Sequence, residues 1–252
     1  MNLAIPQNIY TALFAMTLPD ELKEKVNVRA SSLITKELKE GKYDVGLIPS
    51  CDLLTHKDLF ISKSYGLSFD GALSNSYIYF VPEQQNLSKI LLRGDISSND
   101  LVLSKILFSE QYNIKMEFSI DTAAIDFEKN DYLIAGLENN QYAVAQNGVS
   151  FADQLAELID FPYVNFVLAS TNDEKLQDLT SRLGKIDDNV TSNIDTLVNK
   201  LGIDTKLQTL IRDNKESVYF DLTENEIDGL KEQIKLAYYH GFIEDINEIN
   251  FV

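Results

Sequence analysis

The stretch GKYDVGLIPSCDLL, residues 41–54, holds the pattern that decides the fold. Its apolar run, residues 45–48, is typical of a buried strand and lies between Asp44 and a Pro-Ser-Cys turn. A strand that only fills a core needs no such ending. The stretch therefore raises a question about function, which is whether the turn at Pro49 and Ser50 faces a ligand.

Strands and helices alternate on both sides of this stretch. Before it, 2–5 and 26–30 are predicted strands with an amphipathic helix over 7–16 between them. A helix over 31–41 starts at two serines, and another starts at Ser97. This rhythm is typical of an α/β protein with a mainly parallel sheet. The later predicted strands are 73–82, 87–94, 114–119, 131–136 and 162–170.

Beyond Ser170 the pattern becomes helical, because leucine, isoleucine and valine recur three or four residues apart from 176 to 201. Such a stripe fits either a coiled-coil dimer or helices packed on their own domain. Gly184 and residues 187–189 interrupt the stripe and favour the second alternative. A last helix begins with a capping box at Thr223 and ends at Gly241. We therefore expect a monomer or a homodimer.

The composition excludes several classes of function. The 252 residues carry a formal net charge of −17, which opposes binding to nucleic acid or to anionic membranes. The single Cys51 permits no disulfide framework and no cysteine-based zinc site, while His56 and His240 leave little material for a metal centre. The sequence shows neither a basic leader nor a run of 18 apolar residues, so we expect a cytoplasmic protein without a membrane span or a metal.

Three segments resemble the chorismate dehydratase family of the futalosine route to menaquinone. They are EGKYDVGLIPSCDLL (40–54), GLSFDGALSNSYIYF (66–80) and VYFDLTENEIDGLKEQIKLAYYHGFI (218–243). The first is similar to the family's G-x-x-D-x-G-L-I-P strand, and the last to its closing helix. The match covers nearly the whole length in the same order. A sister enzyme that cleaves the cyclic futalosine intermediate shares the family's fold, and the resemblance does not separate the two activities.

The resemblance implies an α/β chain with the type II periplasmic-binding-protein fold, in which two lobes enclose a ligand cleft. Residues 1–78 plus 169–252 would form one lobe, residues 79–168 the other, with crossovers near Ile78 and Leu168. In this layout Pro49 and Ser50 lie at the carboxyl end of a strand, where open α/β sheets bind ligands. The resemblance thus answers the opening question by placing the turn at the cleft.

The helix start at 97–100 is the expected anion site. The family carries an S-R-T-S motif there, which would hold a substrate carboxylate at the helix N-terminus. Here the motif becomes Ser97, Ser98, Asn99 and Asp100, so the arginine is missing and a negative charge is added. The first three side chains could still donate hydrogen bonds to a substrate, or all four residues could only cap their helix.

The remaining candidate contacts are also implied by the resemblance. Asn8, in the first strand-to-helix turn, is the best single candidate for a polar or catalytic contact, and it suits a helix N-cap equally well. Of the neighbours Asn75 and Ser76, only one can face the cleft from a strand. Glu138 could point into the cleft or stay exposed in a first helical turn, and Tyr163 could form a pocket wall or part of the core.

Three functional hypotheses follow. The first is a chorismate dehydratase-like lyase that converts chorismate to enolpyruvyl-benzoate and water, with no cofactor. The second is a non-catalytic paralogue that binds a small polar ligand between the lobes. The missing arginine, Asp100 and the net charge favour the second. In the third, side chains such as Tyr77, Tyr79 and Tyr163 close the cleft, and the protein acts through its surface.

Overall fold

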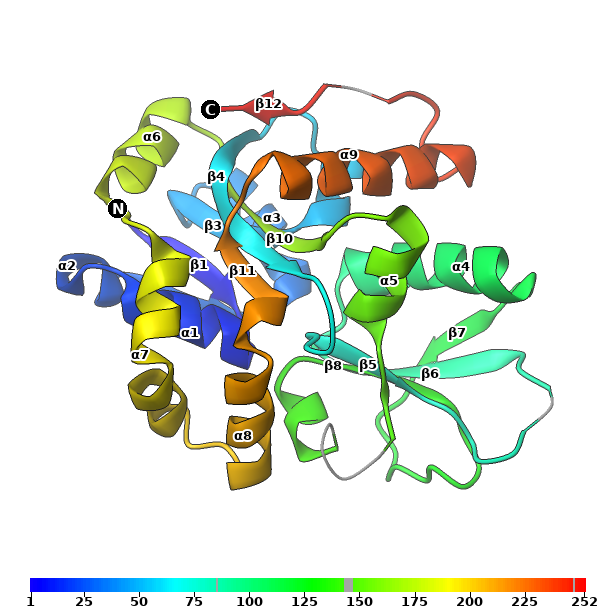
Figure 1. Ribbon diagram of the computed structural model, residues 1–252. Helices are drawn as coiled ribbons and strands as arrows, with labels where there is room; N and C mark the ends of the chain where they lie inside the picture. Colours follow the sequence, from blue (N-terminus) through cyan, green and yellow to red (C-terminus); the bar gives the residue numbers. More distant parts are fainter. Residues whose placement is uncertain (85, 143–146, 247) are drawn as a thin grey trace.

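The computed structural model describes residues 1–84, 86–142, 147–246 and 248–252. Its strands form two sheets that lie side by side with helices around them (Figure 1). The seven-stranded sheet has the order β11-β4-β10-β3-β1-β2, with β12 paired to β4. The five-stranded sheet has the order β7-β6-β8-β5-β9. Alternating helices and strands confirm the predicted α/β class.

The larger sheet contains the N-terminal and C-terminal strands of the chain. Its strands are β1 (Leu3–Pro6), β2 (Val26–Arg29), β3 (Val45–Pro49), β4 (Phe60–Phe69), β10 (Tyr163–Ser170), β11 (Val218–Asp221) and β12 (Asn250–Phe251). The helices of this part are α1 (Ile9–Thr17), α2 (Asp20–Lys23), α3 (Ser31–Lys39), η1 (Ser50–Leu54), α6 (Asp173–Arg182), α7 (Ile186–Lys200), α8 (Thr205–Asp213), η3 (Lys215–Ser217) and α9 (Glu224–Tyr239).

The smaller sheet is built from the middle of the chain. Its strands are β5 (Ser76–Tyr79), β6 (Lys89–Gly94), β7 (Glu117–Ile120), β8 (Tyr132–Ala135) and β9 (Val149–Ser150). Its helices are α4 (Ser98–Tyr112), η2 (Gly136–Gln141) and α5 (Phe151–Ile159). The chain passes into this sheet between residues 69 and 76 and returns between 150 and 163, a few residues before each predicted lobe boundary. The predicted lobe limits themselves stay a prediction.

Both sheets are mixed, so the prediction of a mainly parallel sheet is wrong. Parallel pairing is found in β2-β1-β3 and in β7-β6-β8, the parts that the βα rhythm describes, and between β4 and β12. The strands nearest the two crossings run antiparallel to their neighbours, with β10 between β3 and β4 and β5 between β8 and β9. The pattern also misses β4, because Ser62, Lys63 and Ser64 interrupt its apolar residues.

The predicted helical stripe beyond Ser170 is divided between α6 and α7. Leu176 and Leu179 of α6 are fully buried, and Ile194, Leu197 and Val198 of α7 are buried in the same core. Helix α7 packs against α1 within the chain, which Figure 1 shows below the larger sheet. The stripe is therefore used for packing on its own domain.

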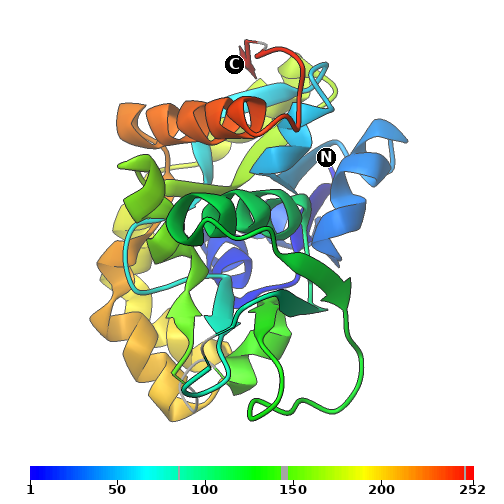
Figure 2. The same ribbon diagram turned by 90° about the vertical axis from the view of Figure 1, so that its right-hand side faces the viewer.

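The two sheets share one hydrophobic core. A single cluster of buried side chains includes Leu47 and Phe69 of the larger sheet and Ile78 and Leu133 of the smaller one. Helix α9 lies over α4 in both views (Figures 1 and 2), and contacts join α9 to α4 and α5. The two parts of the chain are thus packed closely together.

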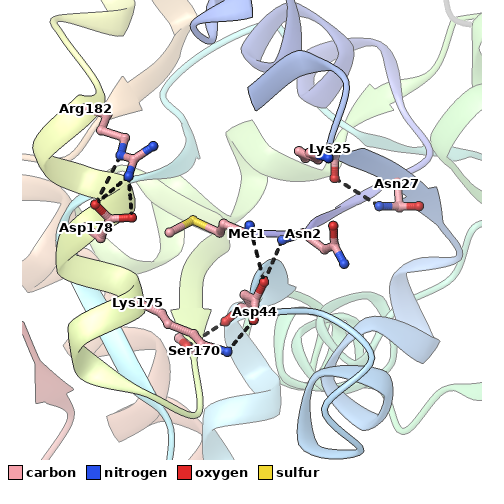
Figure 3. A network of polar contacts seen from close by, with 9 residues as sticks. All are labelled: Met1, Asn2, Lys25, Asn27, Asp44, Ser170, Lys175, Asp178 and Arg182. Carbon is pink, nitrogen blue, oxygen red and sulfur yellow. Dashed lines mark hydrogen bonds and ion pairs between the residues drawn. The ribbon is translucent and has the colours of Figure 1, made fainter. Parts of the chain in front are cut away.

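Asp44, the aspartate of the opening stretch, holds the amino end of the larger sheet together (Figure 3). Its carboxylate accepts a hydrogen bond from the Asn2 N–H at 2.7 Å and pairs with the Lys175 ammonium and, at 3.8 Å, with the Met1 amine. Its carbonyl accepts a hydrogen bond from the Ser170 hydroxyl. Asp44 therefore links β1, β3 and the start of α6 at the end of the strand opposite Pro49.

Candidate functional site

A small pocket lies where the two sheets meet. One wall comes from the turn after β1, a second from the segment that enters β5, and a third from η2 after β8. Because β1 and β8 both end at this pocket, it occupies the place where open α/β sheets bind ligands. Its lining residues are Asn8, Ile9, Tyr10, Ser74, Asn75, Tyr77, Gly136, Asn139, Asn140 and Leu207.

Asn8 is both a helix cap and a pocket residue. Its Oδ1 accepts a hydrogen bond from the Thr11 N–H at 2.8 Å, which fixes Asn8 as the N-cap of α1. Because Oδ1 is used in this way, Nδ2 is the atom left over, and it is buried without a hydrogen-bond partner in the described chain. Only 5% of Asn8 is exposed. The two roles that the sequence suggested for Asn8 are therefore compatible.

Asn75 contributes a second polar atom without a partner, from the segment that connects the two sheets. Its Oδ1 is buried and accepts no hydrogen bond from the described residues, while its backbone carbonyl accepts one from Gly136. The neighbouring Ser76 turns the other way and donates to Asp100 at 2.6 Å. This alternation agrees with the expectation that only one of the two can face the pocket.

The pocket is narrow and neutral in this arrangement. The cavity has a volume of about 10 Å³, which is close to the roughly 10–15 Å³ that a single water needs. None of the described lining residues carries a charge, and burial raises the pKa of Tyr77 to about 12. Gly136 allows the start of η2 to lie close to the turn after β1. A Cβ at position 136 would lie only 2.9 Å from the Asp95 Cβ and 3.2 Å from the Gln7 carbonyl oxygen.

The start of α4 is occupied by its own side chains. Ser97 is the N-cap, and Asp100 accepts hydrogen bonds from the Ser97 N–H and hydroxyl at 2.8 and 2.7 Å. Asp100 is fully buried, and this burial raises the pKa of its carboxyl group. The Ser98 hydroxyl is buried without a partner in the described chain, but it does not line the pocket.

Asn99 connects the two parts of the chain. It is fully buried, and its Oδ1 accepts hydrogen bonds from the Cys51 N–H at 2.7 Å and the Ser50 hydroxyl at 3.2 Å. Its Nδ2 donates to the Asn165 carbonyl in β10. The turn after Pro49, which the sequence placed at a ligand, therefore contacts the first turn of α4, and neither Pro49 nor Ser50 lines the pocket.

A second hydrogen-bonded connection between the two parts of the chain was not predicted from the sequence. Asp95, just after β6, accepts hydrogen bonds from the Ser31 N–H at 2.9 Å and the Ser31 hydroxyl at 2.5 Å. Ser31 begins α3, a helix that packs against the larger sheet. The N-cap residue, Ala30, has no polar side chain that could accept a hydrogen bond from the first N–H groups of this helix. Asp95 thus caps a helix of the other part of the chain, and desolvation raises the pKa of its carboxyl group. The only sequence signal was the alanine at a cap position.

The last two candidates lie outside the pocket. Glu138 pairs with Arg93 at 2.7 Å, and Arg93 also pairs with Asp121. Tyr163 is 1% exposed, its hydroxyl accepts from Asn165, and its ring contacts Phe151 edge to face. The described residues contain no group of three His, Cys, Asp or Glu side chains that could hold a metal ion. In the same part of the chain, no helix is long and apolar enough to cross a membrane.

Comparison with known proteins identifies the fold. No family profile matches the sequence, and no curated protein matches it significantly. Among solved structures, protein AF1704 from Archaeoglobus fulgidus is similar with a TM-score of 0.66 and 15% identity, over 96% of this chain and 98% of that one. The periplasmic aliphatic sulphonate binding protein SsuA from Escherichia coli is similar with a TM-score of 0.63 and 11% identity, over 99% and 90%.

A third similar structure is the Candida albicans CA3427 gene product, described as having the generic periplasmic binding protein fold. Its TM-score is 0.62 at 9% identity, over 98% of this chain and 92% of that one. At these identities the similarity shows the fold alone. The chain therefore has the two-lobed α/β fold of periplasmic binding proteins, and its strands form two sheets.

Proposed function

We propose that this protein binds a small polar ligand in the pocket between its lobes and does not transform it. The observation that carries this proposal is the pair of buried polar atoms, Asn8 Nδ2 and Asn75 Oδ1, which have no partners among the described residues. Buried polar groups in proteins are almost always hydrogen-bonded, and exceptions need an explanation. A ligand that pairs with both atoms supplies one.

The arrangement of carboxylates disfavours a dianion such as chorismate. The helix N-termini at the lobe interface, α3 and α4, already hold the carboxylates of Asp95 and Asp100. Two like charges about 4 Å apart cost about 1 kcal/mol in water and about 4 kcal/mol at an effective dielectric near 20. The described residues that line the pocket include no lysine or arginine to offset this cost.

The second candidate function is the chorismate dehydratase-like lyase of menaquinone biosynthesis. The three motifs of the sequence resemblance, and the presence of Asn8 and Asn75 in one pocket, support it. In this case binding groups and the exclusion of water on lobe closure would do most of the work. The carboxylates of Asp95 and Asp100 would then have to be protonated or displaced when the substrate binds.

One experiment separates the two functions. The purified protein is incubated with chorismate, and the mixture is analysed by mass spectrometry for loss of one water, while the melting temperature is measured against a panel of neutral, anionic and cationic metabolites. We expect no turnover and a rise in melting temperature with a neutral polar compound. Catalysed loss of water would replace the binding proposal with the lyase. A folded protein that responds to no compound would refute binding between the lobes.

A further inference from the structure

We infer that the ligand of this pocket is an uncharged molecule with a carboxamide group, or a cyclic amide that presents the same two atoms. The inference rests on the proposed function, because it concerns the same pocket. Asn8 offers a donor, and Asn75, whose side-chain amide has no hydrogen-bond partner among the described residues, can turn its oxygen to the ligand as an acceptor. Only 5% of Asn8 and 4% of Asn75 are exposed. An amide carries the complementary pair, since its carbonyl oxygen accepts and its N–H donates.

The assignment of donor and acceptor is fixed for Asn8 by its own cap. Thr11 donates its backbone N–H, so the side-chain atom that accepts it must be the oxygen, and the NH₂ group must point elsewhere. That group therefore requires an acceptor from the ligand. A ligand carboxylate could satisfy Asn8, but it would bring a negative charge into a pocket whose described lining residues carry no charge to balance it. The uncharged lining thus favours an amide over its acid.

The surroundings favour a neutral, partly apolar molecule. The buried rings of Tyr10 and Tyr77 and the side chains of Ile9 and Leu207 form apolar walls, beside the uncharged polar residues Ser74, Asn139 and Asn140. Burial also raises the pKa of Tyr10, so both phenols stay uncharged at neutral pH. Because the present space fits about one water, a larger ligand enters only when the lobes separate.

The test uses two sets of matched probes: acetamide, acetate and ethanol, and nicotinamide, nicotinate and 3-pyridylmethanol. Each set keeps the methyl or pyridyl group and changes only the polar group. Binding is measured by ligand-observed NMR and calorimetry on the wild-type chain. We expect the amide of at least one set to bind at least tenfold more tightly than its acid and its alcohol, which is the penalty for a buried polar group left unpaired.

The variant Asn8→Asp replaces the donor NH₂ group with an oxygen and adds a negative charge. Its carboxylate still accepts from the Thr11 N–H, and a negative charge at a helix N-terminus is favourable, so the fold is kept. We expect amide affinity to fall at least tenfold. The matched control is Asn172→Asp, the same change at the exposed N-cap of α6, which should leave affinity unchanged. Asn75→Leu removes the acceptor and should lower the affinity for the amide by a similar factor.

Several outcomes would overturn the inference. Preferential binding of the acid or the alcohol would refute the amide assignment, but the proposed binding between the lobes would stand if Asn8→Asp still changed the affinity. Amide binding that is equal in wild type and Asn8→Asp would place the amide elsewhere. If no probe of either set binds, the amide assignment fails, and the metabolite panel described above decides separately whether the pocket binds anything.

Discussion

The two ends of the larger sheet use aspartate in opposite ways. At the amino end, Asp44 is partly exposed and paired with Lys175, and this hydrogen-bonded ammonium lowers the pKa of its carboxyl group. At the end that faces the other lobe, the carboxylates of Asp95 and Asp100 accept hydrogen bonds from hydroxyl and backbone N–H groups, and burial raises the pKa of both. Charge attraction thus secures the outer end, whereas at the inner end hydrogen bonds from uncharged donors hold the carboxylates, that of Asp95 across the two parts of the chain and that of Asp100 within the smaller one.

The largest effect is expected from Asp100→Ala. The change leaves the hydroxyl groups of Ser76 and Ser97 without their acceptor and breaks the capping box of α4. We expect the free energy of unfolding to fall by about 3 kcal/mol, measured by chemical denaturation. Asp228→Ala, which breaks an exposed pair with Lys231, is the control and should cost less than about 1 kcal/mol. An equal loss of unfolding free energy in both variants would contradict the distinction between buried, hydrogen-bonded carboxylates and exposed, charge-paired ones.

A smaller effect is expected from Asp95→Ala, which removes the cap that one lobe supplies to the other. The loss of a helix cap costs about 1–2 kcal/mol. Because the acceptor of the Ser31 N–H comes from the other lobe, amide hydrogen exchange at Ser31 should accelerate. Asp95→Asn keeps one accepting oxygen and should lie between wild type and alanine. Unchanged exchange at Ser31 in the alanine variant would show that Asp95 does not hold the lobes together.

The parts of the fold that depend on local pattern could be predicted from the sequence. The strand at 45–49 and the helices starting at Ser97 and Thr223 follow from apolar periodicity and capping residues, which act within a few residues. The mixed direction of the sheets could not be predicted in this way. It depends on which distant strands pair after the chain has crossed between lobes, and the resemblance alone implied those crossings.

The same distinction between local signals and long-range contacts applies to the candidate site. Asn8 could be predicted as an N-cap because a cap position after a strand is a local signal, and its role at a ligand stays a prediction. The contacts of Asn99 with Cys51 and of Asp95 with Ser31 join residues 48 and 64 positions apart, and no periodicity reports on such pairs. Pro49 and Ser50 were expected at the ligand because they follow a strand, but the first turn of α4 covers that strand end.

A pH-dependent effect is expected from Asp187, a third carboxylate held by backbone N–H groups. It accepts from the Phe220 and Asp221 N–H groups, and burial raises its pKa from 3.8 to about 6. A raised folded-state pKa means that the folded chain binds this proton more tightly, so stability falls as the pH rises from about 4 to about 6. After allowance for solvent screening, the change is about 1 kcal/mol.

The measurement is the free energy of unfolding of wild type and Asp187→Asn at pH 4.5 and pH 7. Relative to the variant, wild type should be about 1 kcal/mol more stable at the lower pH than at the higher one. Asp188→Asn changes the adjacent, exposed carboxylate and serves as the control. A difference that does not vary with pH would show that Asp187 keeps an ordinary pKa in the folded chain.

The smallest effect is expected at the amino end of the sheet. Asp44→Asn removes the attraction to Lys175, while an amide oxygen can still accept from the Asn2 N–H. The loss should be about 0.5 kcal/mol at low ionic strength and should vanish near 1 M salt, where the Debye length is about 3 Å. Because the pKa of Asp44 is lowered, its contribution is present at neutral pH and is lost as the pH falls through that pKa, which is the opposite sign to Asp187. Denaturation at low and high salt tests this, and a loss that persists at 1 M salt would mean that Asp44, like Asp100, acts through hydrogen bonds instead of charge.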